Sequence, residues 1–224
     1  MTATWRVELH CHSFYSADCA MTFDDLIGVV RRQRLDCLAL TDHNRLAGAL
    51  ELRRIAPFPV IAGQEIRTTE GEIIGLFLRE EIPRRLTPEE TIARIRAQGG
   101  VVYVPHPFDS FRGSRLAPAA LARIVEQVDV LEVWNGRALW PLDNLRAARF
   151  AARHGLLQAA ASDAHTVGEV GRSYVVVPPF HDAPSFLAAV AQARLVRRVA
   201  PPWVHLARDA ATGRGAARAV SGET

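Results

Sequence analysis

Two histidines separated by one residue stand near the start of the chain, in Val7-Glu8-Leu9-His10-Cys11-His12. Apolar and polar residues alternate before them, as in a β-strand, whose side chains have a period of two. His10 and His12 are therefore expected on one face, and Cys11 on the other. Two neighbouring imidazoles at the end of a strand can chelate a metal ion, and Asp18 follows closely enough to add a carboxylate. Such a pair also occurs on ordinary surfaces and in cores, so a metal site can be inferred only with support from the rest of the chain.

Similar polar groups follow the other predicted strands. They are Asp42, His43 and Asn44 after residues 36–41, Glu65 after 60–63, His106 after 101–104, and Asp163 and His165 after 157–161. In an α/β barrel the carboxyl ends of parallel strands meet in one rim, where the active sites lie. Five of the eight histidines fall at these positions. Imidazoles and carboxylates in such number favour a multinuclear metal site.

Helices are expected between these strands. Thr22 predicts a helix start, with acidic residues in the first turn and arginines at the end, and Thr87-Pro88-Glu89-Glu90 predicts another. Further helices are expected over residues 47–55, 118–127, 142–154 and 183–193, and further strands over 72–78, 130–135 and 173–177. The regular pattern fades from Arg194. We predict one α/β barrel domain over residues 1–205 and a flexible basic tail over 206–224.

The composition restricts the chemistry. All 27 basic residues are arginine, which excludes a lysine Schiff base and a P-loop lysine. A phosphate clamp must then use arginine, backbone amides or a metal. Arg45, Arg137 and Arg172 follow predicted site motifs, and Arg172 is the preferred candidate. Asn135 is a further candidate for substrate binding.

The remaining features concern location and partners. The three cysteines have no C-x-x-C spacing, so a disulfide framework is not expected. No apolar run suits a membrane span and no signal peptide is evident, so we expect a cytoplasmic protein without a membrane partner. A net charge of +3 is too small to argue for nucleic acid. The sequence does not indicate the oligomeric state.

The ordered motifs resemble a known family. His-x-His followed by Ser and Asp, then Thr-Asp-His-Asn, Gly-x-Glu, Pro-His-Pro and Ser-Asp-Ala-His, is similar to the motif set of the polymerase and histidinol phosphatase (PHP) domain. The similarity runs from about Val7 to Val177. It implies a distorted (β/α)7 TIM-like barrel, with a metal site at the carboxyl ends of the strands and two or three divalent ions. The mixed nitrogen and oxygen ligands suit manganese, zinc or iron.

The resemblance also implies a role for each motif residue. The first ion would be held by His10, His12, Glu65 and Asp163, the second by Glu65 and His106, and the third by Asp18, His43 and His165. Glu72 stands where family members often have histidine, and its carboxylate would favour harder cations. Catalytic roles are expected for Asp163, His43 and Arg172.

Such a site predicts hydrolysis of a phosphate ester by a metal-activated hydroxide. A small phosphorylated metabolite or nucleotide is the expected substrate. The alternative is a 3'-5' or 5'-3' exonuclease or oligonucleotide phosphodiesterase, for which nucleic acid would be the partner; this is not favoured. A non-catalytic metal-binding scaffold is the least favoured interpretation, because a degenerate barrel is expected to lose ligands, and a retained ligand set without a metal would be costly.

Overall fold

The structure, a computed structural model, describes residues 3–200, whose strands form one nine-stranded sheet. The strand order across the sheet is β7-β6-β5-β4-β3-β2-β1-β8-β9. The bounds are β1 (Trp5–Glu8), β2 (Cys37–Leu40), β3 (Val60–Thr68), β4 (Gly71–Leu76), β5 (Val101–Val104), β6 (Val130–Asn135), β7 (Leu157–Ala161), β8 (Tyr174–Val177) and β9 (Arg194–Val196). A parallel bridge from Cys11, after β1, to Ala164, after β7, draws the two sides of the sheet together. The sheet is thus a nearly closed barrel, and the predicted fold class is confirmed.

Strand β4 departs from a regular parallel barrel. Strands β1, β2 and β3 pair in parallel, as do β5, β6 and β7, whereas β4 is antiparallel to both β3 and β5. The β3–β4 hairpin turns at Gly71, whose φ of +132° suits only glycine, and a Cβ there would lie 2.3 Å from the Leu116 Cα. The reversal brings the start of β4, with Glu72, beside the carboxyl half of β3.

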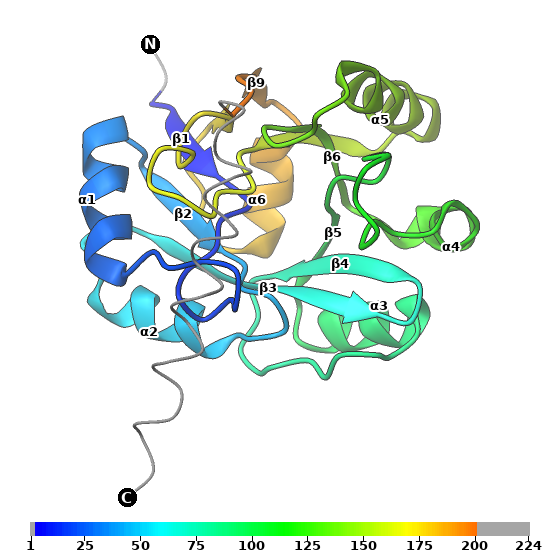
Figure 1. The fold of residues 1–224 in the computed structure, drawn as a ribbon, viewed down its shortest axis with the longest axis horizontal. Coiled ribbons are helices and arrows are strands. Elements are labelled where there is room, and N and C mark those ends of the chain that lie inside the picture. The colour runs from blue at the N-terminus through cyan, green and yellow to red at the C-terminus, as the bar shows by residue number, and fades with distance from the viewer. Residues whose placement is uncertain (1–2, 201–224) are drawn as a thin grey trace, which may run out of the picture.

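In the part of the chain that the structure describes, six α-helices surround or close this barrel (Figure 1). They are α1 (Phe23–Gln33), α2 (Ala47–Ile55), α3 (Pro88–Ala97), α4 (Pro118–Ile124), α5 (Pro141–His154) and α6 (Ala183–Val190), with a 3₁₀-helix, η1 (Val125–Gln127), after α4. Thr22 and Thr87 cap α1 and α3, as predicted, and each cap is part of a capping box. Within residues 3–200, no helix has the length and apolar character needed to cross a membrane.

Two differences from the expected elements lie near the carboxyl end. The helix after residue 183 is shorter than expected, and β9 was not predicted. The three residues of β9 are too few to show an alternation of apolar and polar side chains in the sequence. The strand is defined instead by its antiparallel pairing with β8. The predicted tail over 206–224 lies outside the described residues.

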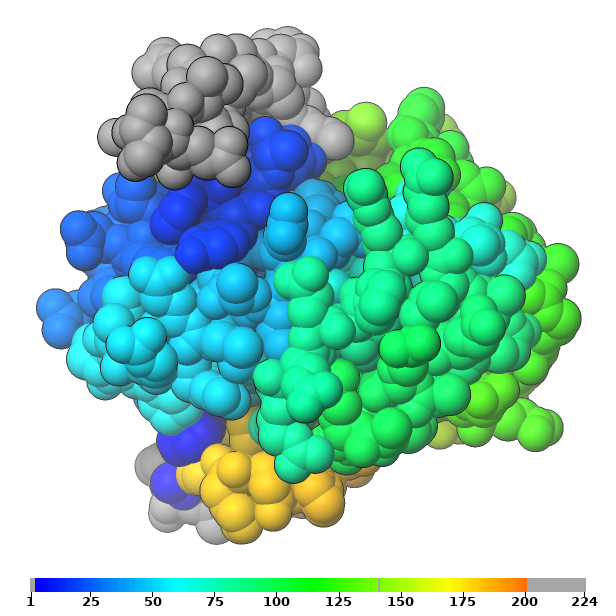
Figure 2. Space-filling view, turned by 90° about the horizontal axis from the view of Figure 1, so that it is seen from below, coloured from blue at the N-terminus to red at the C-terminus, as the bar shows by residue number. Residues whose placement is uncertain are grey.

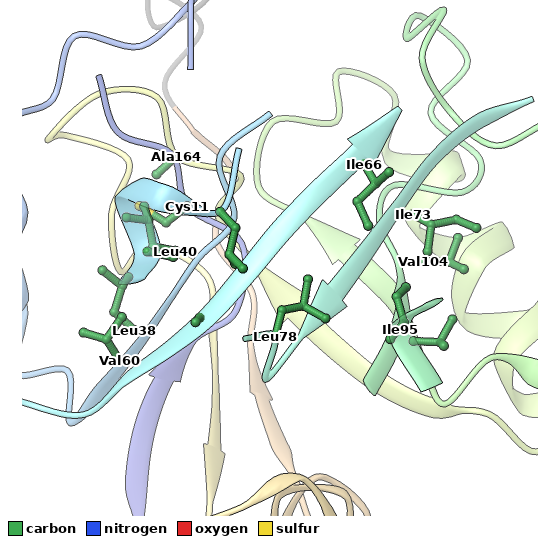
Figure 3. Packing of buried hydrophobic residues seen from close by; sticks show 14 of the residues in the cluster. Cys11, Leu38, Leu40, Val60, Ile66, Ile73, Leu78, Ile95, Val104 and Ala164 are labelled. Carbon is green, nitrogen blue, oxygen red and sulfur yellow. The ribbon is translucent and has the colours of Figure 1, made fainter. Parts of the chain in front are cut away.

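The core consists of two layers. Outward-facing side chains of the sheet pack beneath α1 to α5; Figure 3 shows Ile66 and Ile73, from the β3–β4 hairpin, among them. Inward-facing side chains such as Val7 and Val175 pack with one another and with Phe186 of α6, so α6 closes one end of the interior. The first half of the chain covers most of the face in Figure 2.

Candidate metal centre

His10 and His12 follow β1, and both side chains are completely buried. Their Nε2 atoms lie 3.2 Å apart. His10 Nδ1 is 3.0 Å from Glu132 Oε2, and His12 Nδ1 is 3.2 Å from Ser16 Oγ. Because these bonds engage the two δ nitrogens, the two ε nitrogens remain directed at the same point. Cys11, between them, packs in the outer core layer.

The carboxylates of Glu65 and Asp163 complete this cluster. Three imidazole nitrogens surround Glu65 Oε2, namely His43 Nδ1 at 2.9 Å, His10 Nε2 at 3.4 Å and His12 Nε2 at 3.5 Å. Three also surround Asp163 Oδ1, namely His12 Nε2 at 3.4 Å, His10 Nε2 at 3.5 Å and His165 Nδ1 at 3.6 Å. Both carboxylates are completely buried. Strand β3, which carries Glu65, and the segments after β1, β2 and β7 therefore converge on one volume.

The entrance of the cluster carries a second group of imidazoles around Asp18. His43 Nε2 is 3.5 Å from Asp18 Oδ1, and His165 Nε2 is 3.5 Å from Asp18 Oδ2. The side chains of His43 and Asp18 are 24% and 14% exposed, so this group faces the solvent side of the cluster. His165 Nδ1 donates to the Asp163 backbone oxygen at 2.9 Å, which leaves Nε2 to face Asp18.

Glu72 and His106 form the opposite side. His106 Nε2 is 3.0 Å from Glu65 Oε1 and 3.8 Å from Glu72 Oε2. Glu72 reaches this position because β4 is reversed, and its Oε1 lies 3.6 Å from Arg67 Nη1. His106 and Asp163 have φ values of +30° and +54°, a strained conformation that is common at functional sites.

These residues fit divalent metal ions. A metal bond of about 2.1 Å separates neighbouring ligand atoms by about 3.0 to 3.4 Å, close to the distances given above. One carboxylate oxygen on each of Glu65, Glu72 and Asp163 is buried and accepts no well-aligned hydrogen bond, although imidazole nitrogens lie near it. Four sets of potential ligand atoms are close enough to share an ion: His12, His43 and His165; His10, His12 and Asp163; His10, Glu65 and His106; His43, Glu65 and Glu72.

Burial and neighbouring charges together shift the pKa values of the cluster residues. Burial lowers the pKa of His10, but Asp163, Glu65 and Glu132 outweigh it and hold this pKa well above its usual range. Burial, together with His165 and His43, holds the pKa of His12 well below its usual range. Burial would raise the pKa of Asp163, yet Arg112 and His10 keep it well below its usual range. The cluster therefore combines ionised carboxylates with imidazoles of unequal basicity.

Buried carboxyl groups outnumber buried guanidinium groups at this end of the barrel. Nine carboxyl groups of the described residues gather there: Glu8, Asp18, Asp42, Glu65, Glu72, Asp109, Glu132, Asp163 and Glu169. Two guanidinium groups, those of Arg112 and Arg137, lie among them. The high pKa of His10 and the raised pKa of Glu8 offset part of the negative charge. Buried charge of one sign is costly, and divalent ions would compensate the remainder.

Four of these carboxylates lie behind the cluster and were not predicted as site residues. Glu8 accepts backbone N–H bonds from three segments, including His10 at 3.4 Å, Ser162 at 2.9 Å and Gly171 at 3.1 Å. Burial raises the pKa of Glu8 to about 7, although these bonds lower it. Glu169 Oε2 accepts from the His165 backbone at 3.1 Å. These bonds hold the ligand-bearing segments against one another.

Asp42 supports His12 and His43 from behind. It accepts from Ser13 Oγ and from Ser16 Oγ, each at 2.7 Å. Ser16 Oγ in turn accepts from His12 Nδ1 at 3.2 Å and from the His43 backbone N–H at 2.9 Å. The sequence signal for Glu8, Asp42 and Glu132 was a carboxylate within or beside an apolar strand, and its function could not be assigned from pattern alone. Glu169 lies in the loop between β7 and β8 and carries no such signal.

The arginines predicted to bind phosphate show no contact with the proposed metal ligands among the described interactions. Arg45 is exposed. Arg137 is buried and lies 3.4 Å from Glu169 Oε1. Arg172, the preferred candidate, donates to the backbone oxygens of Gly168 at 3.0 Å and Val199 at 3.2 Å. Their substrate-binding roles stay predictions.

Arg112, which was not among the predicted arginines, lies directly against Asp163. Its Nη2 lies 2.5 Å from Asp163 Oδ2, and its Nε lies 3.5 Å from Asp109 Oδ2. Asn135 Nδ2 donates to the same Asp163 oxygen at 3.1 Å. Arg112 follows the Pro-His-Pro motif closely, so the reasoning applied to Arg45, Arg137 and Arg172 could have included it.

Comparison with known proteins agrees with this geometry. Residues 8–77 match the family model of the PHP domain, and residues 141–195 match the PHP-associated family model. Two uncharacterized proteins of Methanocaldococcus jannaschii are each 37% identical to this chain; the matches cover 76% and 58% of this chain, and 69% and 81% of the relatives.

Solved structures share the fold. One is PsfC from Pseudomonas syringae, with a TM-score of 0.70 at 18% identity, covering 95% of this chain and 99% of that chain. Another is a two-domain protein of Bacteroides vulgatus described as containing a predicted PHP-like metal-dependent phosphoesterase. Its TM-score is 0.68 at 17% identity, over 88% of this chain and 66% of that chain. The relatives, the matched family models and the shared fold lead to one conclusion: this chain belongs to the PHP domain family.

Proposed function

We propose that this chain is a divalent-metal-dependent phosphoesterase that hydrolyses a phosphomonoester of a small metabolite or nucleotide. The observation that carries the proposal is the set of imidazole nitrogens 2.9–3.6 Å from Glu65 Oε2 and Asp163 Oδ1, with Arg112 on the other Asp163 oxygen. Bound divalent ions would neutralise phosphate oxygens and lower the pKa of a water molecule. The proposed ligands are those predicted above, with Glu72 included.

The side chains around the ions would position the phosphate. The guanidinium of Arg112 has five N–H donors, and its contacts with Asp163 and Asp109 leave donors for phosphate oxygens. Asn135 holds the shared Asp163 oxygen from the opposite side. His43, at the entrance, is placed either to ligate an ion or to hold a proton at Nε2 near a leaving group.

A terminal phosphate suits the depth of this cluster. His10, His12, Glu65 and Asp163 are completely buried, whereas Asp18 and His43 are partly exposed at the entrance. A phosphomonoester can insert its terminal group into such a site, but a polymer chain would have to pass across the entrance. The proposal therefore favours a small substrate.

A second candidate is cleavage of a phosphodiester in a dinucleotide or short oligonucleotide. Phe111, beside Arg112, is 69% exposed, and Trp140, before α5, is 50% exposed. Ser110 is tied to Asp143 of α5 by hydrogen bonds of 2.8 and 3.0 Å, so both aromatic residues lie on adjoining loops. Exposed aromatic rings beside a phosphate site can stack on bases.

Metal content and hydrolysis together test the proposal. Protein loaded with manganese, zinc or iron is expected to bind two or three ions and to hydrolyse phosphomonoesters. We expect Asp163→Ala to lower kcat by about 10²–10³-fold, the loss typical when one electrostatic group of a site is removed. Asp24→Ala, an exposed acid on α1, is the matched control and should leave hydrolysis unchanged.

The outcomes separate the candidates. Turnover of nucleoside monophosphates or other monoesters alone supports the phosphatase. Turnover of a dinucleotide alone moves the conclusion to the phosphodiesterase. Unchanged hydrolysis by Asp163→Ala, or the absence of bound metal, would contradict both.

A further inference from the structure

Glu132 lies on β6 and contacts three of the segments that build the cluster. Its side chain is buried, and each of its oxygens accepts two hydrogen bonds. Oε2 accepts from His10 Nδ1 at 3.0 Å and from the Tyr103 hydroxyl at 2.7 Å. Oε1 accepts from Asn135 Nδ2 at 2.6 Å and from the His106 backbone N–H at 3.1 Å.

A β-bulge makes this arrangement possible. In a regular strand, residues three apart point to opposite faces. The pairing of β6 with β7 shifts register between Glu132 and Trp134, so Val133 is an extra residue and the alternation changes phase. Val133 packs in the outer layer, whereas Glu132 and Asn135 both face inward and contact each other.

The bond to His10 decides which ring nitrogen of His10 carries the proton. A carboxylate only accepts, so the proton of a neutral His10 lies on Nδ1. The Nε2 lone pair then faces Glu65 Oε2 at 3.4 Å and Asp163 Oδ1 at 3.5 Å. A carboxylate behind a ligating histidine also raises the basicity of that ligand.

We propose that Glu132 is a positioning residue that fixes the tautomer of His10 and couples the His10, His106 and Asn135 segments, thereby setting the affinity for the metal ion. The proposal rests on the proposed function only in taking the cluster as a metal site. It concerns no contact of Glu132 with substrate.

Glu132→Gln tests the tautomer directly. The glutamine oxygen has to face Asn135 and His106, because both present N–H donors, so its amide nitrogen faces His10. That amide donates to Nδ1 and shifts the His10 proton to Nε2, the nitrogen directed at the cluster. We expect metal affinity to fall about 10- to 100-fold. The measurement is competition for zinc or manganese with a chromophoric chelator, alongside circular dichroism.

Tyr103→Phe is the matched control. It removes a hydrogen bond to the same Glu132 oxygen but leaves the His10 bond, so metal affinity is expected to change by less than about threefold. An equal loss in both variants would indicate a merely structural role. Unchanged affinity in Glu132→Gln would overturn the proposal.

A measurement on the unaltered protein keeps the test independent of whether the variant folds. In nitrogen-15 spectra of the histidines of zinc-loaded protein, His10 should carry its proton on Nδ1 and hold zinc through Nε2. Zinc on Nδ1, or His10 free of zinc, would overturn the proposal. Failure of the proposed function would look different: zinc would bind as expected but no phosphate ester would be hydrolysed.

Discussion

The interior of the barrel has two ends of opposite chemistry. At one end Phe186, Ala189 and Val190 of α6 pack on apolar side chains of the sheet. At the other end imidazoles and ionised carboxylates fill the interior. Burying the apolar end stabilises the fold by about 25 cal/mol for each Å² removed from water, whereas the polar end costs free energy unless cations compensate it. The fold is therefore held mainly by one end, and the chemistry is placed at the other.

The largest expected effect comes from breaking the apolar end. Phe186→Ala should lower the free energy of unfolding by about 3–5 kcal/mol, because the ring is completely buried and contacts the rings of Phe77 and Phe180. Chemical denaturation measures this loss. The folded fraction should keep its metal content and its hydrolysis rate. Loss of bound metal in folded Phe186→Ala would contradict the separation of the two ends.

An intermediate effect is expected at the polar end. Arg112→Lys should reduce kcat/KM about 10- to 100-fold, because an ammonium lacks the fork that we propose joins Asp163 to phosphate, and a hydrogen bond to a charged group contributes about 1.5–3 kcal/mol. Steady-state kinetics measure it. The free energy of unfolding should change little in comparison with Phe186→Ala.

Two further lysine variants sharpen this test. Arg172→Lys shows whether the arginine preferred from the sequence has the role instead, and a larger loss there than in Arg112→Lys would favour it. Arg153→Lys, on the exposed side of α5, serves as the control and should leave kcat/KM unchanged.

The smallest effect is expected far from both ends, at the capping box of α1. Thr22→Ala should cost about 1 kcal/mol of unfolding free energy, with hydrolysis unchanged. Hydrogen bonds from Thr22 lower the pKa of Asp25, so its contribution is present above the unfolded-state pKa and is lost as the pH falls through the folded-state pKa. The difference in unfolding free energy between Thr22→Ala and the unaltered protein should narrow, without vanishing, as the pH falls. The bond that Thr22 Oγ1 donates to Asp25 needs the ionised carboxylate, whereas the bond that it accepts from the Asp25 N–H does not. A constant difference across that range would contradict the linkage.

Much of the fold could be predicted because local signals agreed with the tertiary structure. Thr22 and Thr87 form the expected helix caps, and the strands that end before Asp42 and His106 lie where the apolar runs predicted them. The sequence also singled out most of the clustered residues, because histidines and carboxylates recurred at strand ends. His10 and His12 share one direction because side chains alternate along an extended chain, which is a local property.

Other features depended on contacts between distant segments. The reversal of β4, which delivers Glu72, requires Gly71 to pass close to Leu116, and no local pattern reports that approach. The bulge in β6 brings Glu132 and Asn135 to the same face, against the regular alternation. Whether an arginine reaches a carboxylate is decided by loop conformation, so Arg112 could not be separated from Arg172 by spacing alone. Sequence determined which residue types stand at strand ends, whereas tertiary pairing decided which of their atoms meet, because periodicity acts along a strand and register acts between strands.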